Sequence, residues 1–289
     1  MTIISILLAI AADRLLPHLH EYRQYHYFLH YVERVRDRFI RPEHEHIGAL
    51  LLLLAPVWLA TALLQYWISG WLFGLVGLLF YAAVLVYCIG PRDLANDVDA
   101  WCEAAESGDP ASEDVATARL AGDAILSDDP AERALDISGT VLVEANGRLF
   151  AVLFWFIVLG PLGAVMYRSA ALLKQHYDDE ASEFAASAAR MHAVLVWLPA
   201  RVLALTYALA GHFDAAIEGW RAAQDERPEG SEGSDEVLVM TGLGALGLEE
   251  DDFAAGGVPA VRSAMRLVWR TLTIWLVVIA VLILAGWAG

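Results

Sequence analysis

The sequence is poor in lysine and cysteine, and it lacks the short motifs that mark common catalytic and nucleotide-binding sites. Lys174 is the only lysine, and the 289 residues carry a net charge of -17. This charge repels phosphates and excludes a nucleic-acid partner. Cys88 and Cys102 form neither a CxxC pair nor a metal-type spacing with histidine, so we expect two free thiols. No P-loop, nucleophile elbow, zinc signature or Ser-His-Asp pattern is present.

The sequence is rich in long apolar segments. Hydrophobic residues make up 58% of the chain, and the mean hydropathy is +0.48. Several apolar runs approach the roughly 20 residues that a helix needs to cross a bilayer. The sequence therefore predicts an all-α, polytopic membrane protein with about six membrane segments and helical acidic loops. The lipid bilayer is its first expected partner.

Composition divides the chain into six regions. Residues 1–46 hold a first membrane helix and a basic amphipathic segment rich in histidine and aromatic residues, 47–90 a helical hairpin, and 91–148 an acidic helical domain. Residues 149–211 hold a central apolar helix and the membrane helix after it, 212–260 an acidic region with several glycines, and 261–289 the last membrane helix.

The distribution of lysine and arginine predicts the orientation of these regions. Most of the positive charge lies in the basic segment, in the two acidic regions and at the start of the last helix. The bias of positive charge towards the cytoplasm places these parts inside. Arg168, Lys174 and Arg190 then remain on the other side.

The central apolar helix is broken by Gly160-Pro161. Proline removes a backbone donor, and lipid cannot replace it. We therefore expect this segment to be packed inside the protein, where another helix or a cavity satisfies the freed carbonyl. A spanning helix and a re-entrant one both fit the pattern, and the predicted orientation fails if the segment re-enters.

Two further patterns predict no binding site. Residues 241–247 read TGLGALG after the strand-like run Val237–Met240. A dinucleotide fingerprint would need a helix N-terminus next, but four acids follow, which favours a flexible glycine-rich connector. His26 and His30 are spaced to share one helix face, and no carboxylate or cysteine completes a metal site convincingly, which favours interfacial imidazoles.

A group of polar residues near the membrane rim forms the candidate site. Glu144 and Asn146 lie where an acidic domain meets the central helix, and with Asp93 or Asp97 they could supply oxygen ligands for Mg²⁺. A helix-cap network is the structural alternative. Arg201 lies inside an apolar helix, where an arginine pairs, binds an anion or snorkels. Glu144 is one candidate partner of Arg201.

Several stretches of this sequence resemble the AmpE family of bacterial inner-membrane proteins. They are MTIISILLAIAADRLL at the start, Gly90-Pro91-Arg92-Asp93-Leu94, GPLGAVMYR at 160–168 and WLPARVLALTYALAG at 197–211. AmpE proteins are in turn similar to the CobD/CbiB synthases, which attach aminopropanol to a corrinoid side chain. The matching elements are Arg92-Asp93-Leu94, Glu144 with Asn146, Gly163-Ala164 with Tyr167-Arg168, and Trp197, Pro199, Ala200 and Arg201. Ala145 splits the Glu-Asn pair here, Arg168 replaces a lysine, and the N-terminal G-D-P and H-P-V signature is missing.

The resemblance implies two functions. The first is an inner-membrane regulatory protein that modulates β-lactamase induction through cell-wall recycling, with a functional link to the AmpD amidase. The second is an amide-forming membrane synthase with an altered substrate, so the sequence leaves open whether the protein is an enzyme. In the second function Glu144 and Asn146 are the catalytic candidates, with Mg²⁺ as a candidate cofactor. Arg92, Asp93, Arg168 and Arg201 are the residues expected to bind a small anionic ligand.

Overall fold

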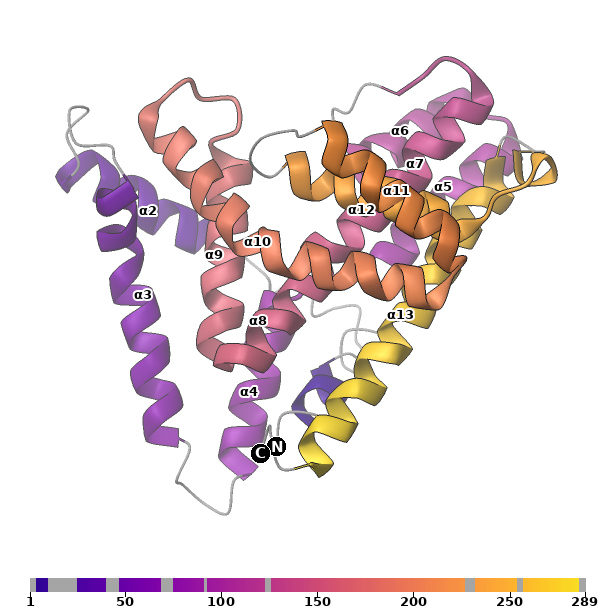
Figure 1. Ribbon diagram of the computed structural model, residues 1–289. Helices are drawn as coiled ribbons and strands as arrows, with labels where there is room; N and C mark the ends of the chain where they lie inside the picture. The colour runs from indigo at the N-terminus through magenta and orange to yellow at the C-terminus, as the bar shows by residue number, and fades with distance from the viewer. Residues whose placement is uncertain are drawn as a thin grey trace. The chain divides into compact units, whose positions relative to one another are not determined.

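The computed structural model describes residues 4–9, 25–39, 47–68, 75–90, 93–122, 126–226, 232–253 and 257–285. Within these ranges the chain is helical and contains no strand (Figure 1). The residues divide into two compact units, which are described separately. The first unit comprises 1–91, 151–197 and 280–289, and the second comprises 92–150 and 198–279.

The helices follow one another along the chain with short connections. The helices that begin before residue 150 are α2 (His26–Phe39), α3 (Ile47–Ile68), α4 (Leu75–Cys88), α5 (Leu94–Ser107), α6 (Pro110–Ala121), α7 (Pro130–Ala145) and the π-helix η4 (Asn146–Phe150). The later helices are α8 (Ala151–Leu159), α9 (Pro161–His176), α10 (Glu183–Ala210), α11 (Phe213–Glu226), α12 (Glu232–Leu246), the short η5 (Glu250–Phe253) and α13 (Val258–Leu284).

Four described helical stretches are long and apolar enough to cross a membrane. They are Ile47–Ile68, Pro130–Leu159, Glu183–Ala210 and Val258–Leu282, and a shorter apolar helix covers Val76–Cys88. The predicted first membrane helix lies largely outside the described residues. The expected fold class, an all-α polytopic membrane protein, is confirmed.

The Gly160-Pro161 break turns the chain back on itself in the first unit. Gly160 has φ 67° and ψ -152°, a conformation that essentially only glycine adopts, and Pro161 begins α9. The two helices then pack closely, because a Cβ on Gly163 of α9 would collide with the backbone carbonyl of Trp155 in α8. The central segment is therefore a helical hairpin and not one spanning helix.

A side chain from α3 serves the backbone at this turn. Gln65 Nε2 donates to the carbonyl oxygen of Leu159 at 3.3 Å, and Gln65 Oε1 accepts from the amide of Leu162 at 3.1 Å. Pro161 is buried. The expectation that another helix supports the broken segment is confirmed, but Val158 and Leu159 just before the break are 54% and 38% exposed, so this part of the segment is not packed inside the protein.

The return of the chain corrects the predicted orientation. Arg36 of α2 makes two hydrogen bonds to the carboxylate of Glu180, at 2.9 and 2.5 Å, and His176 lies 3.1 Å from Glu33. The basic helix and the turn between α9 and α10 thus lie at the same end of the first unit. The prediction that Lys174 and Arg190 lie opposite the basic segment is wrong, because the hairpin brings residues 174–183 back to it.

In the second unit, α11 and α12 form a closely packed helix pair within the acidic region 212–260. Residues 241–247 belong to the end of α12 and the turn after it, so the expected strand and flexible connector are both wrong. The glycines allow backbone-to-backbone contact between α11 and α12: a Cβ on Gly244 would collide with the carbonyl of Ala215, and one on Gly219 with that of Met240. The glycine pattern therefore serves helix packing.

Aspartates cap the three helices of the acidic domain. Asp93, Asp109 and Asp129 each accept a hydrogen bond from a backbone amide of the first turn of α5, α6 and α7. Proline occupies the first position of α6 and α7, where no amide donor is needed. Asp129 is the N-cap of α7, directly before Pro130.

Candidate functional site

The centre of the candidate site is Arg148, which joins two helices of the second unit. Its Nη1 lies 2.5 Å from Asp97 Oδ2 of α5, and its Nε lies 2.6 Å from Glu144 Oε2 of α7. The Arg148 and Asp97 side chains are only 12% and 10% exposed, whereas Glu144 is 38% exposed. A buried charge is tolerated only when it is paired, so these contacts hold α5 against the end of α7.

The backbone around Arg148 is unusual. Residues 146–150 form one turn of π-helix between α7 and α8. Such turns insert an extra residue into an α-helix, and they occur frequently at functional sites. Here the wider turn contains both Asn146 and Arg148.

Asn146 has a buried acceptor that no described residue serves. Its side chain is 1% exposed, and Oδ1 has no hydrogen-bond partner among the described residues. An unserved buried acceptor costs about 1–3 kcal/mol. A ligand that donates an N–H or O–H to Oδ1 would remove this cost.

Arg201 and Asp93 make different contacts. Arg201 Nη1 lies 3.4 Å from Ser234 Oγ of α12, whereas Glu144 pairs with Arg148, so the suggested Glu144–Arg201 pair does not form. Asp93 accepts the amide of Ala95 at 2.9 Å and acts as the N-cap of α5. Arg92 lies outside the described residues.

Arg168 belongs to the first unit. It is 7% exposed in α9, and its Nε donates to the carbonyl oxygen of Cys88 at 2.5 Å. Cys88 ends α4, so the guanidinium complements the negative end of that helix dipole. The adjacent Ser169 accepts a hydrogen bond from the indole of Trp58.

The structure therefore brings together Glu144 and Asp97, which the sequence suggested as possible Mg²⁺ ligands, through Arg148, which was not named as a site residue. The four-residue spacing of Glu144 and Arg148 is the sequence signal for their contact, because side chains four apart lie on one helix face. Asp97 is far away in the sequence, and its spacing gives no such signal.

The expected magnesium site does not fit these residues. The carboxylates of Asp97 and Glu144 are both paired with the guanidinium of Arg148. No group of three or more His, Cys, Asp or Glu side chains suited to a metal ion occurs among the described residues. His26 and His30 are no exception; their rings lie 6.0 Å apart, edge to face.

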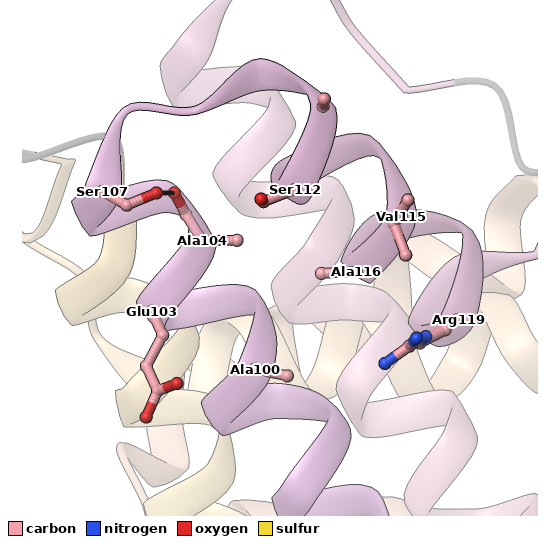
Figure 2. A pocket seen from close by; sticks show the side chains of 9 residues that line it. Ala100, Glu103, Ala104, Ser107, Ser112, Val115, Ala116 and Arg119 are labelled. Carbon is pink, nitrogen blue, oxygen red and sulfur yellow. Dashed lines mark hydrogen bonds between the residues drawn. The ribbon is translucent and has the colours of Figure 1, made fainter.

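A shallow groove of about 520 Å³ lies between α5 and α6 in the same unit (Figure 2). Its floor consists of small side chains such as Ala100, Ala104 and Ala116. Figure 2 shows the guanidinium of Arg119 pointing towards α5, with Ser112 at the other end of the groove. The Ser112 hydroxyl bonds to Asp109, so it serves the start of α6.

The comparisons with known proteins point to two named groups. The chain matches the family described as the regulatory signalling modulator protein AmpE over residues 1–288. The cobalamin biosynthesis protein CobD of Chromobacterium violaceum is 32% identical over 254 residues, which cover 79% of this chain and 76% of that protein. Protein AmpE of Shigella flexneri is 26% identical over 299 residues, which cover 99% of each chain.

No solved structure matches the chain. The family match extends over nearly every residue, and the CobD relatives support the resemblance to that second group. The chain belongs to the AmpE family of membrane proteins, with CobD proteins among its relatives.

Proposed function

We propose that this protein is a regulatory protein of the bacterial inner membrane that modulates β-lactamase induction through cell-wall recycling. The observation that carries the proposal is the family match along the whole chain. The proposed link to the AmpD amidase follows from the same family. The ligand proposed to regulate this protein is a small anionic molecule released from the cell wall.

The Arg148 cluster is the proposed place where such a ligand acts. A ligand whose carboxylate binds Arg148 competes with Asp97 for this arginine. An N–H group of the same ligand can donate a hydrogen bond to Asn146 Oδ1. Binding then releases α5 from the π-helix turn. The ligand then has different contacts when α5 is bound to the π-helix turn and when it is released. A ligand needs such a difference in order to shift the populations of two conformations.

The test is complementation of a strain that carries an inducible β-lactamase and lacks its AmpE gene. We expect wild-type protein to restore both the induced β-lactamase activity and the muropeptide pools, and Arg148→Ala to restore neither. Arg119→Ala removes an exposed arginine of α6 and is the matched control. Immunoblots confirm equal amounts in the membrane. Unchanged induction and pools after gene deletion would refute the proposal.

A second candidate function is an amide-forming synthase of the CobD type. The CobD relatives support it, and so does Asn146, whose buried oxygen could accept a hydrogen bond from an attacking amine. The test is growth that depends on cobalamin synthesis in a strain lacking CobD. Rescue by wild-type protein but not by Asn146→Leu would support the synthase, and no rescue at normal expression would count against it.

A further inference from the structure

An apolar groove of about 390 Å³ lies between two membrane helices of the first unit. Pro56, Val57, Ala60 and other residues of α3 form one wall, and Phe80 and Val84 of α4 form the other. Tyr31 of α2 closes one end. Because both walls belong to apolar helices, the groove opens where lipid chains surround the protein.

Local features of α3 shape this groove. Pro56 lacks an amide donor, so the helix loses a backbone hydrogen bond one turn earlier. Tyr31 donates its hydroxyl to the carbonyl of Leu53 at 3.1 Å beside this break, and Tyr25 donates to the carbonyl of Tyr87 at the end of α4 at 2.8 Å. Tyr31 of α2 and Tyr25, just before α2, thus contact the two helices that form the walls. Figure 1 shows α2 beside α3.

Cations continue from Tyr31 along the same face of α2. Residues 27, 31, 34 and 38 recur at the spacing of one helix face, and they are Tyr27, Tyr31, Arg34 and Arg38. Arg34 and Arg38 are both exposed on this face, whereas the two acids of α2, Glu33 and Asp37, lie off it. The third arginine, Arg36, is already bound to Glu180. Tyr27 is 70% exposed, as expected of an aromatic ring at the membrane interface.

We propose that this groove is a binding site for an anionic phospholipid. One acyl chain fills the groove between α3 and α4, and the phosphate lies against Arg34 and Arg38. Charge complementarity selects the occupant, because a zwitterionic lipid has a positive group of its own to place beside the two arginines. The site is separate from the Arg148 cluster, so it does not depend on the function proposed above.

The test is native mass spectrometry of the detergent-purified protein with phosphatidylglycerol or phosphatidylcholine of identical chains. We expect phosphatidylglycerol to be retained preferentially. The double variant Arg34→Ala with Arg38→Ala should bind it more weakly, by about fivefold for each arginine removed. Arg119→Ala with Arg221→Ala removes two exposed arginines outside α2 and is the matched control.

A second pair of variants tests the groove itself. Ala60→Phe fills it, whereas Leu59→Phe changes a neighbouring residue of α3 that is 61% exposed and does not line it. We expect Ala60→Phe to weaken binding of both lipids and Leu59→Phe to leave binding unchanged. Equal losses in the α2 double variant and its control would refute the proposal. So would unchanged binding in Ala60→Phe, or a protein dimer that excludes lipid.

Discussion

At the scale of single residues, Arg148 combines two properties that are costly on their own. It places a positive charge in a mostly buried position of an apolar helix, and it does so in a π-helical turn. The two carboxylates offset the cost of the charge, but the turn leaves Asn146 Oδ1 unserved. Strain of this kind persists where function requires it, and this makes the cluster the strongest candidate site of the second unit.

Removing Arg148 should destabilise the protein through the charge that it leaves behind. We expect Arg148→Ala to lower the free energy of unfolding by about 3 kcal/mol, because Asp97 stays buried without its partner. The double variant Asp97→Asn with Arg148→Ala should recover part of this loss. Glu144→Gln should cost less than about 1 kcal/mol, since Glu144 is more exposed and its pairing is screened. Denaturant unfolding in detergent measures all three variants, and an equal loss in each would contradict this account.

At the scale of elements, the hairpin of α8 and α9 depends on one glycine and one glutamine. Gly160 permits the turn, and Gln65 supplies the donor and the acceptor that lipid lacks. A Cβ on Gly160 would lie 2.8 Å from Gln65 Nε2, so a larger residue must displace the amide. The conformation of the turn at Gly160 and the position of the Gln65 side chain therefore depend on each other.

Gly160→Ala should cost about 1–3 kcal/mol through backbone strain, and Gln65→Leu should cost about 1–3 kcal/mol through the two backbone groups left unserved. Because the first change already displaces Gln65, the double variant should cost less than the sum of the two. Thermal unfolding in detergent gives the comparison. Gly122→Ala is the control for strain alone, since Gly122 has a similar backbone conformation, with φ 61° and ψ -133°, but nothing lies within 4 Å of its Cβ position. Strict additivity would show that Gln65 does not support the turn.

The contact between α2 and the α9–α10 turn should respond to acid. The hydrogen bond from Arg36 holds the pKa of the Glu180 carboxyl below its usual 4.5. A carboxyl with a lowered pKa stabilises the fold above its unfolded-state pKa, and this contribution is lost as the pH falls through the lowered value. We expect wild type to unfold at a higher temperature than Glu180→Gln at neutral pH, and the gap to close in acid below pH 4.5. A gap that persists there would mean that packing, and not the charge, holds the contact.

The sequence predicted the elements whose physical cause is local. Apolar length identified the helices α3 and α4. It also predicted that the Gly160-Pro161 break needs support from another helix. It could not identify Gln65, because a contact across 97 residues leaves no periodicity to read.

The prediction made from the glycines of residues 241–247 was wrong because their role, too, depends on contacts with other helices. Gly244 lets α12 approach α11 and Gly242 lets it approach Leu142 of α7, and both contacts depend on the partner helix. Within the candidate site, the pairing of Glu144 with Arg148 was visible as a four-residue spacing, whereas Asp97 comes from another helix.

At the scale of the whole molecule, the hairpin decides where the charged turn after α9 lies relative to the basic helix α2. Arg168 bonds to the end of α4, and His176 and Glu180 contact α2, so these parts of the first unit share one end. The basic helix α2 and the turn that follows Lys174 therefore lie at one end of the first unit. The bias of positive residues towards the cytoplasm predicts that this end lies inside.

Cysteine accessibility in a variant without Cys88 and Cys102 tests this arrangement. Arg38→Cys in α2 and Asp179→Cys in the α9–α10 turn should react with a membrane-impermeant maleimide from the same side, because Arg36 and Glu180 are in direct contact. Tyr66→Cys, 79% exposed near the far end of α3, should react from the other side, since α3 is long enough to cross the bilayer. Labelling of the first two positions from opposite sides would mean that the central segment spans the membrane and that the hairpin is not its native form.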